Sequence, residues 1–182
     1  AYLEAAAARR REPELVGALL EKAHEQVNLV SERLRQLSRG IVPAGNEAGA
    51  LRQALEQYVL DAGSIMGIEC TLRARGDFSD VGAESAGHVY RIVQEAITNA
   101  VRHGQARSVS VRLARAGERC SLSVRDDGKG CDLSLVHPTH PGMGLKSMQA
   151  RARALRGQFS LHNRRSGGCE VLLRWSEPVA RD

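Results

Sequence analysis

The chain has 182 residues and a formal net charge of +5; 42% of its residues are hydrophobic and 26% are charged. These values fit one medium-sized domain, or one domain with a helical appendage, and exclude a compositionally extreme chain. A basic balance can indicate nucleic-acid binding, but only 3% of the residues are aromatic and the arginines are not interleaved with stacking side chains. We therefore interpret the arginines as solvated helix faces and expect no nucleic-acid partner, although a phosphorylated ligand or an acidic partner also suits this charge.

The cysteines and the apolar segments indicate the compartment. Cys70, Cys120, Cys131 and Cys169 form no CxxC pair and have no histidine at zinc-binding spacing, so we expect free thiols and a cytoplasmic location. No signal-peptide pattern and no apolar run of bilayer length is present. We expect no membrane contact by this chain, which we interpret as an excised piece of a parent protein that is able to carry a membrane anchor.

The N-terminal quarter predicts a long helix with a dimerisation seam. Residues 1–11 favour a first helix, Pro13 interrupts it, and a second helix is predicted over 14–39. Its apolar positions recur in alternating steps of four and three, which is a heptad pattern that calls for a partner helix. They are Val16, Leu20, Ala23, Val27, Val30, Leu34, Leu37 and Ile41. The alternative is an amphipathic helix packed on its own domain.

The remaining sequence predicts alternating helices and hairpins. A turn-rich connection at 43–49 separates an expected helical unit, 1–43, from a second domain, 44–182. Helices are predicted over 47–66, 82–103 and 145–156, and strands over 69–75, 108–115, 119–127, 158–163 and 169–175. A glycine-rich loop covers 127–144. The resulting order, α-β-α-β-β-loop-α-β-β, indicates an α+β sandwich with its helices on one face, not a doubly wound parallel sheet.

The segment QEAITNAVRH, residues 94–103, carries the first set of candidate site residues. Glu95 and Asn99 are four residues apart, so they lie on one helix face at the edge of the core. Asn99 offers an amide oxygen to Mg²⁺, and Glu95 can orient or deprotonate a reacting group. Arg102 and His103 can neutralise phosphate charge at the same helix end. The alternative is a solvated helix face.

Two glycine-rich segments, DDGKG at 126–130 and GMGLKS at 142–147, carry the second set. Asp126 can accept a hydrogen bond from an exocyclic amine such as that of adenine, and Gly128 and Gly130 allow close backbone approach. Alternatively, this aspartate merely caps a turn. The Gly142–Lys146 stretch enters a helix whose N–H groups can bind phosphate, with charge added by the lysine. That stretch comprises Gly142, Met143, Gly144, Leu145 and Lys146. The intervening residues predict a lid.

Together and in this order, the three segments resemble the N, G1 and G2 boxes of the GHKL ATPase superfamily. The stretches VYRIVQEAITNAVRHG and GMGLKSMQARARALRGQFSL are similar to sensor histidine kinases paired with helix-turn-helix response regulators. RLRQLSRGIVP resembles the second helix of their dimerisation hairpin. The resemblance covers about residues 14–175 and implies a two-layer α/β sandwich preceded by a heptad helix.

The resemblance also implies an activity and a set of roles. Asn99 would ligate Mg²⁺, Glu95 would be the catalytic residue, and Asp126 would bind the adenine amine. His103 would lie near the phosphates, and the glycines Gly128, Gly130, Gly142 and Gly144 would shape the pocket and the lid hinges. The implied reaction transfers the γ-phosphate of ATP to a histidine and then to an aspartate of a response regulator, within a homodimer formed by the heptad helix. The chain departs from the family at Cys169, which follows Gly167-Gly168 where a threonine is frequent.

Other residues and motifs of the chain offer alternatives to this interpretation. His24 is followed by an acidic residue, as a phosphoacceptor would be, but only 75 residues separate it from Asn99, which leaves no room for a second hairpin helix. We therefore expect the acceptor upstream of Ala1. A P-loop is excluded because Lys146 does not follow a glycine directly, and a dinucleotide-binding unit is excluded because no strand precedes a GxGxxG. An ATP-hydrolysing switch, a serine kinase and a degenerate, non-catalytic dimerisation module remain open.

Overall fold

The computed structural model describes residues 50–131 and 143–178, all within Val42–Asp182, the second of the two units into which the chain divides. The heptad helix expected over 14–39, the 43–49 connection, most of the expected lid and Gly142 lie outside the described residues. The elements are α3 (Ala50–Met66), β1 (Glu69–Arg75), α4 (Ala83–Arg102), β2 (Ser108–Ala116), β3 (Arg119–Asp126), α5 (Met143–Ala154), β4 (Gln158–Asn163) and β5 (Cys169–Ser176).

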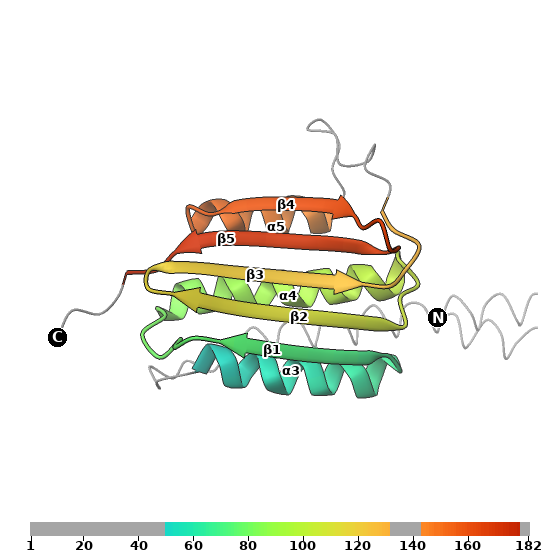
Figure 1. Ribbon diagram of the computed structural model, residues 1–182, viewed down its shortest axis with the longest axis horizontal. Coiled ribbons are helices and arrows are strands. Elements are labelled where there is room, and N and C mark those ends of the chain that lie inside the picture. The colour runs from blue at the N-terminus through green and yellow to red at the C-terminus, as the bar shows by residue number, and fades with distance from the viewer. Residues whose placement is uncertain (1–49, 132–142, 179–182) are drawn as a thin grey trace, which may run out of the picture. The chain divides into compact units, whose positions relative to one another are not determined.

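The strands form one mixed sheet in the order β1-β2-β3-β5-β4. β1 and β2 pair in parallel through the crossover helix α4, whereas the β2–β3, β3–β5 and β4–β5 pairs are antiparallel. Figure 1 shows α4 and α5 together behind the strands, with α3 along the β1 edge. The two-layer α+β sandwich predicted from the sequence is confirmed, and a doubly wound sheet is absent from this part of the chain.

The core lies between the sheet and the helices because both have one apolar face. Alternate strand residues such as Val111 on β2 and Leu122 on β3 are fully buried, and so are Ile92 and Ile97 at helical spacing on α4. The rings of Tyr58 on α3 and Tyr90 on α4 meet edge to face with centroids 5.6 Å apart, a favourable aromatic geometry that ties the two helices together.

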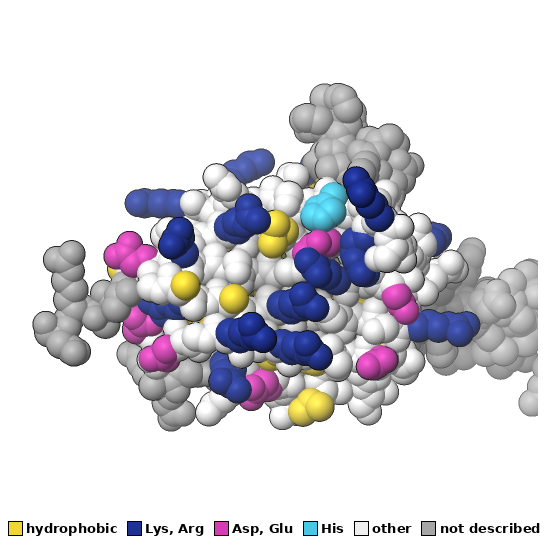
Figure 2. All heavy atoms as spheres, viewed as in Figure 1, with side chains coloured by type: hydrophobic (Ala, Val, Ile, Leu, Met, Phe, Trp, Pro, Cys, Tyr) yellow, Lys and Arg dark blue, Asp and Glu magenta, His cyan; other side chains and the backbone are white. Residues whose placement is uncertain are grey.

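The opposite face of the sheet is polar and rich in arginine. Figure 2 shows Lys and Arg side chains spread across this face. Six arginines occupy outward positions of the strands: Arg73, Arg75, Arg112, Arg119, Arg125 and Arg174. The interpretation of the arginines as helix faces was therefore incomplete, because the period of two that buries every second strand residue turns these arginines to solvent.

A buried ion pair fixes the loop that precedes α4. The guanidinium of Arg115, whose side chain is 5% exposed, donates to both carboxylate oxygens of Asp80 and to the carbonyl oxygens of Asp77 and Gly117. These bonds hold residues 76–82 against the β2–β3 hairpin. Since α4 begins directly after this loop, the ion pair helps to set the position of the helix that carries Glu95.

The C-terminal helix begins earlier than predicted. The sequence indicated helix from Leu145, because Gly144 disfavours a helix, but α5 starts at Met143. Packing of this first turn against α4 overrides the low helix propensity of glycine. Among the described residues, no helix has both the length and the apolar character required for a membrane span.

Candidate functional site

α4 presents Glu95 and Asn99 side by side at the edge of the core. Both side chains are half-buried, whereas their neighbours Ala96, Ile97 and Ala100 are buried. The amide nitrogen of Asn99 donates a hydrogen bond to Oε1 of Glu95 over 3.2 Å. With its nitrogen committed to this bond, the amide oxygen is the atom of Asn99 that can meet a cation.

α5 packs directly on this pair through Gly144. A Cβ atom added at residue 144 would overlap Oε1 of Glu95 and would lie 3.3 Å from Nδ2 of Asn99. A side chain at residue 144 would require the carboxylate of Glu95 to move, so glycine allows this approach without displacing it. The first turn of α5 therefore lies against the face of α4 that carries the two polar side chains, although the two segments are far apart in the sequence.

The other predicted residues of this first turn differ in exposure. Leu145 is half-buried and packs against the core, whereas the ammonium-bearing side chain of Lys146 is exposed. Further along α5, Arg151 is influenced by the charge of Glu95. Burial lowers the pKa of its guanidinium, as does the charge of Arg91, while Glu95 opposes both effects. Sequence reasoning did not single out this arginine.

Asp126 lies at the end of β3, and its carboxylate is held from two sides. Oδ1 accepts the backbone N–H of Gly128 over 2.8 Å, and Oδ2 accepts the backbone N–H of Cys169 over 3.1 Å. The guanidinium of Arg164 also donates to the backbone carbonyl oxygen of Asp126 over 2.6 Å. Asp126 as a whole is only 7% exposed. Its carboxyl group is therefore fixed in one orientation.

The turn after Asp126 is joined to the end of α4. The backbone N–H of Lys129 donates to the carbonyl oxygen of Gly104 over 2.9 Å, and a Cβ added at Gly128 would overlap that same oxygen. At the next turn position, Gly130 has a φ of +91°, which only glycine adopts readily. Residues 126–130 and 143–147 thus both converge on α4, one at its C-terminal end and the other on its face.

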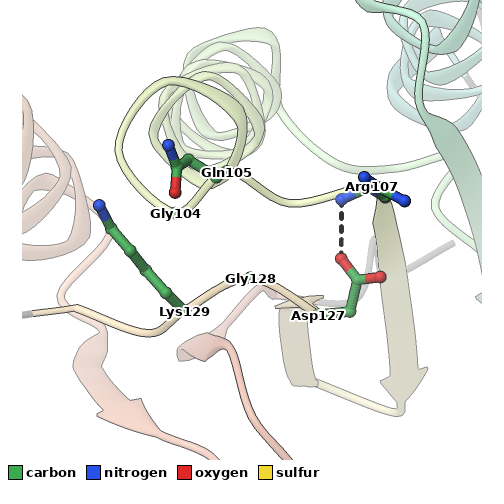
Figure 3. Close-up of a pocket in the computed structure, with 6 residues that line it drawn as sticks. All are labelled: Gly104, Gln105, Arg107, Asp127, Gly128 and Lys129. Carbon is green, nitrogen blue, oxygen red and sulfur yellow. Dashed lines mark hydrogen bonds between the residues drawn. The ribbon is translucent and has the colours of Figure 1, made fainter.

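A cavity of about 360 Å³ lies between the end of α4 and this turn, and Figure 3 shows Lys129 extending from the turn toward the helix end. Its lining consists of Gly104, Gln105, Arg107, Asp127, Gly128 and Lys129. Of these, sequence reasoning assigned only Gly128 to the site. Because the lining includes none of Glu95, Asn99 and Asp126, this cavity adjoins the converging segments and is not their common pocket.

Asp127 has a structural role in this cavity wall. Its carboxylate accepts the backbone N–H groups of Arg107 and Ser108, each over 2.9 Å. The hydrogen bond from Ser108 is the main reason that the pKa of Asp127 lies below its ordinary value. The two adjacent aspartates thus face different partners, and only Asp126 is bonded to β5.

The predicted phosphate-neutralising residues Arg102 and His103 are exposed at the end of α4. The backbone N–H of His103 closes the helix by donating to the carbonyl oxygen of Asn99 over 2.9 Å. Met143 opens α5. Arg102 and His103 thus lie shortly after Asn99 at the end of α4, and Met143 directly precedes Gly144.

Asn163, at the end of β4, was missed by sequence reasoning. Its Oδ1 accepts the backbone N–H of Cys131 over 2.8 Å, and its Nδ2 donates to the carbonyl oxygen of Cys131 over 2.9 Å. These two hydrogen bonds have the pattern of strand pairing, with the side-chain amide of Asn163 in place of a backbone amide. They attach the turn after Asp126 to β4. An asparagine directly before the Arg-Arg-Ser-Gly-Gly turn was the available signal.

The donor set fits a magnesium nucleotide. An amide oxygen beside a carboxylate suits a hard cation, and a fixed, buried carboxylate suits an amine. The described residues contain no group of three or more His, Cys, Asp and Glu side chains that could hold a metal. Asn99 would therefore bind Mg²⁺ together with oxygens of the nucleotide and water.

Comparison with known proteins places the chain in a family. Residues 84–179, just over half of the chain, match the model described as histidine kinase-, DNA gyrase B- and HSP90-like ATPases. The chain belongs to this family of ATPases.

Curated relatives extend the likeness over most of the chain. It is 32% identical over 161 residues to the nitrate/nitrite sensor protein NarX of Escherichia coli strain K12, covering 88% of the chain and 26% of that protein. It is 31% identical over 163 residues to the sensor histidine kinase LnrJ of Bacillus subtilis strain 168, covering 90% of the chain and 38% of that protein. The chain therefore spans only a minor part of these relatives.

Solved structures show the same fold. The ATP-binding domain of PrrB from Mycobacterium tuberculosis is 23% identical with a TM-score of 0.58, over 70% of this chain and 93% of that one. The histidine kinase domain from Erythrobacter litoralis EL346 is 24% identical with a TM-score of 0.59, over 79% and 71%. The family match and the curated relatives confirm the resemblance to GHKL ATPase domains of sensor histidine kinases, and these structures confirm its fold.

Proposed function

We propose that the chain is the ATP-binding catalytic part of a sensor histidine kinase. It transfers the γ-phosphate of ATP to a histidine that is not among those of this chain, and the phosphate then passes to an aspartate of a response regulator. The observation that carries this proposal is the convergence on α4 of the two glycine-rich segments, with Gly144 against Glu95 and the Asp126 turn bonded to Gly104. The names of the curated relatives support the same function.

In this proposal the residues near α4 bind and orient the phosphates. Asn99 ligates Mg²⁺ through its amide oxygen, and Glu95, which its neighbour holds by a hydrogen bond, orients or deprotonates the attacking imidazole. Arg102, His103 and Lys146 offset phosphate charge at the two ends of the site. When bound, magnesium ATP supplies the phosphoryl group and neutralises its developing charge.

The base end of the site is built on Asp126. Its carboxylate, held by the backbone N–H groups of Gly128 and Cys169, accepts a hydrogen bond from the adenine amine. Because both backbone donors are fixed, the carboxylate binds this amine without first changing its orientation. Gly130 and the segment beginning at Gly142 flank the nucleotide on the sides of the turn and of α5.

The proposed partners follow from the same function. The heptad seam over 14–39 pairs two copies of the full-length protein, and the phosphate acceptor downstream is a response regulator. The protein requires neither nucleic acid nor membrane contact through this part, and the site faces the cytoplasm, where ATP is available.

Nucleotide titration tests the proposal. An ATP analogue should bind the chain in the presence of Mg²⁺, and Asn99→Ala should abolish the Mg²⁺-dependent part of the affinity while circular dichroism shows an intact fold. Asp126→Asn should weaken binding of the adenine nucleotide, whereas Asp127→Asn, on the adjacent residue, should leave it unchanged. Unchanged affinity in Asn99→Ala removes the metal-ligand role, and absence of binding at millimolar nucleotide contradicts the proposed function.

A further inference from the structure

Two of the four cysteines meet beside the Asp126 carboxylate. Cys131 directly follows the glycine turn after Asp126, and Cys169 is the first residue of β5. Their sulfur atoms lie 3.4 Å and 3.3 Å from the same atom, Oδ1 of Asn163. Cys131 and Cys169, which are far apart in the sequence, thus both hold their thiols near this oxygen atom.

The backbone around both thiols is held in place. Asn163 accepts from and donates to the backbone of Cys131, and it is the cross-strand partner of Cys169 in the β4–β5 pair. The backbone N–H of Cys169 is in turn bonded to Asp126. These contacts hold the two thiols near the same asparagine, which favours formation of a bond between them.

The other two cysteines have a different environment. Cys70 and Cys120 project from strands toward the core, and burial raises the pKa of each thiol to about 11. A thiol of this kind is almost fully protonated at neutral pH and behaves as a small apolar side chain. They provide internal controls for any reaction of Cys131 and Cys169.

We propose that Cys131 and Cys169 are a modification site at which a peroxide forms a reversible intramolecular disulfide, and that this bond lowers the affinity of the adjacent site for adenine nucleotides. The effect on affinity rests on the proposed function, whereas formation of the disulfide does not. The chemical class of the oxidant is a hydroperoxide, with hydrogen peroxide as the simplest member.

The reaction balances in two steps. The thiolate of Cys131 attacks one oxygen of hydrogen peroxide, the O–O bond breaks, and a sulfenic acid and one water result after protonation. The thiolate of Cys169 then attacks the sulfur of Cys131, forms the S–S bond and displaces hydroxide, which leaves as a second water. In total the two sulfurs lose two electrons, and these electrons reduce the peroxide to water. A dithiol reductant reverses the oxidation.

The order of attack follows from the environments of the two thiols. Burial raises the pKa of Cys169, and hydrogen bonding to the Cys131 thiol raises it further. Cys169 is therefore protonated at neutral pH, so Cys131 reacts first with the oxidant and Cys169 resolves the sulfenic acid. The rate of disulfide formation should rise with pH as the Cys169 thiolate becomes populated.

The disulfide would alter the support of Asp126. The two backbone donors to its carboxylate belong to Gly128, in the turn before Cys131, and to Cys169 itself. An S–S bond of about 2.05 Å draws residue 131 toward β5 and away from Asn163. Since Asn163 holds the turn through its two hydrogen bonds to the backbone of Cys131, moving residue 131 would shift the turn that carries Gly128 and disturb the carboxylate that receives the adenine amine.

Peptide mass spectrometry tests bond formation directly. The reduced chain is treated with hydrogen peroxide, unfolded in an alkylating agent and digested. We expect a peptide pair linked through Cys131 and Cys169, two hydrogens lighter than the free peptides and released by dithiothreitol, with Cys70 and Cys120 alkylated. The link should persist in Cys70→Ser and Cys120→Ser and should form several-fold more slowly in Asn163→Ala. Separate sulfinic acids, links between two chains, or unreacted thiols on Cys131 and Cys169 would overturn the proposal.

Nucleotide titration of the same samples tests the consequence. Oxidation should weaken binding of an ATP analogue by roughly tenfold, equivalent to about 1.4 kcal/mol, and dithiothreitol should restore it. Cys131→Ser should bind equally well before and after peroxide treatment. A disulfide-linked chain with unchanged affinity overturns the regulatory role, whereas a reduced wild-type chain that binds no nucleotide contradicts the proposed function and leaves the disulfide result standing.

Discussion

Gly144 of α5 lies so close to Glu95 of α4 that a methyl group at residue 144 would occupy the position of the carboxylate oxygen Oε1. The same methyl group would stand 3.3 Å from the amide nitrogen of Asn99. The absence of a side chain at residue 144 therefore leaves room for the carboxylate of Glu95 between α4 and the first turn of α5.

Gly144→Ala tests this contact. The added methyl should displace the carboxylate of Glu95, so we expect a loss of about tenfold in affinity for magnesium ATP; because this carboxylate is the flexible end of its side chain, the stability loss should be no more than about 1 kcal/mol, at the low end of overpacking. Isothermal titration and urea unfolding measure the two effects. Gly117→Ala is the matched control: its φ of +61° disfavours alanine, but no atom lies within 4 Å, so it should lose stability and retain nucleotide affinity.

Asp126→Ala removes the acceptor for two backbone N–H groups. Leaving the N–H groups of Gly128 and Cys169 without their partner should lower the free energy of unfolding by roughly 1–3 kcal/mol. Asp126→Asn retains one oxygen acceptor and should lose less stability, yet it should still bind adenine nucleotides poorly because its amide turns a donor toward the adenine amine. A titration in which Asp126→Asn keeps wild-type affinity for ATP would remove the residue from the base site.

Glu170→Gln should change the dependence of stability on pH. Burial tends to raise the pKa of Glu170, but hydrogen bonds from Ser123 and Arg125 and the charges of Arg125 and His162 outweigh it and hold the pKa below its ordinary value. A carboxyl whose folded pKa is depressed stabilises the fold above its unfolded pKa of about 4.3, and this stability is lost as the pH falls through the folded value.

The variant should therefore lose about 1–2 kcal/mol at pH 7, where the ionised acceptor is fully engaged. Between pH 5 and acid unfolding, its stability should fall less steeply than that of the wild type, as urea titrations at several pH values would show. Glu56→Gln breaks a pair with Arg52 that is about half exposed on both sides and should change stability by less than about 0.5 kcal/mol. Parallel pH curves for wild type and Glu170→Gln would contradict the expectation.

Arg115→Met leaves the carboxylate of Asp80 and several carbonyl oxygens without their donor. Breaking a mostly buried ion pair from one side costs about 3 kcal/mol, so the melting temperature should fall clearly. Arg112→Met is the control on the same strand, because Arg112 is exposed and faces the like charge of Arg73 across the β1–β2 pair. We expect it to change stability by less than about 0.5 kcal/mol; equal losses in the two variants would show that the ion pair contributes little.

The elements of the fold that depend on local residue patterns could be predicted from the sequence. The alternation that buries Val111 and Leu122 and the helical spacing that buries Ile92 and Ile97 predicted β2, β3 and α4 within two residues of their ends. Pairing between distant strands was not predictable in the same way. Nothing in the local pattern of β1 indicates that it lies parallel to β2, because that register depends on how α4 returns the chain to the sheet.

The candidate site was predictable in composition but not in contacts. Glu95, Asn99 and Asp126 were selected by residue type and spacing, and the structure places them on the expected elements. The shared acceptor Asn163 and the buried partner of Arg115 were missed, because both contacts join residues more than 30 positions apart. The spacing of residues in the sequence predicts which of them share a helix face. It does not predict these long-range contacts, because they depend on how the strands assemble into the sheet.

The central position of β3 has a consequence for the order in which the domain assembles. β2 and β3 close through a tight turn at Gly117, and β4 and β5 close through a short one, so each hairpin forms at little loop-closure cost. The β3–β5 pairing joins residues such as Arg125 and Glu170, which are 45 positions apart, and slows with this separation. Because Asp126 receives the N–H of Cys169 only when these hairpins join, the carboxylate that we propose binds adenine gains this support only after the two halves of the sheet have paired.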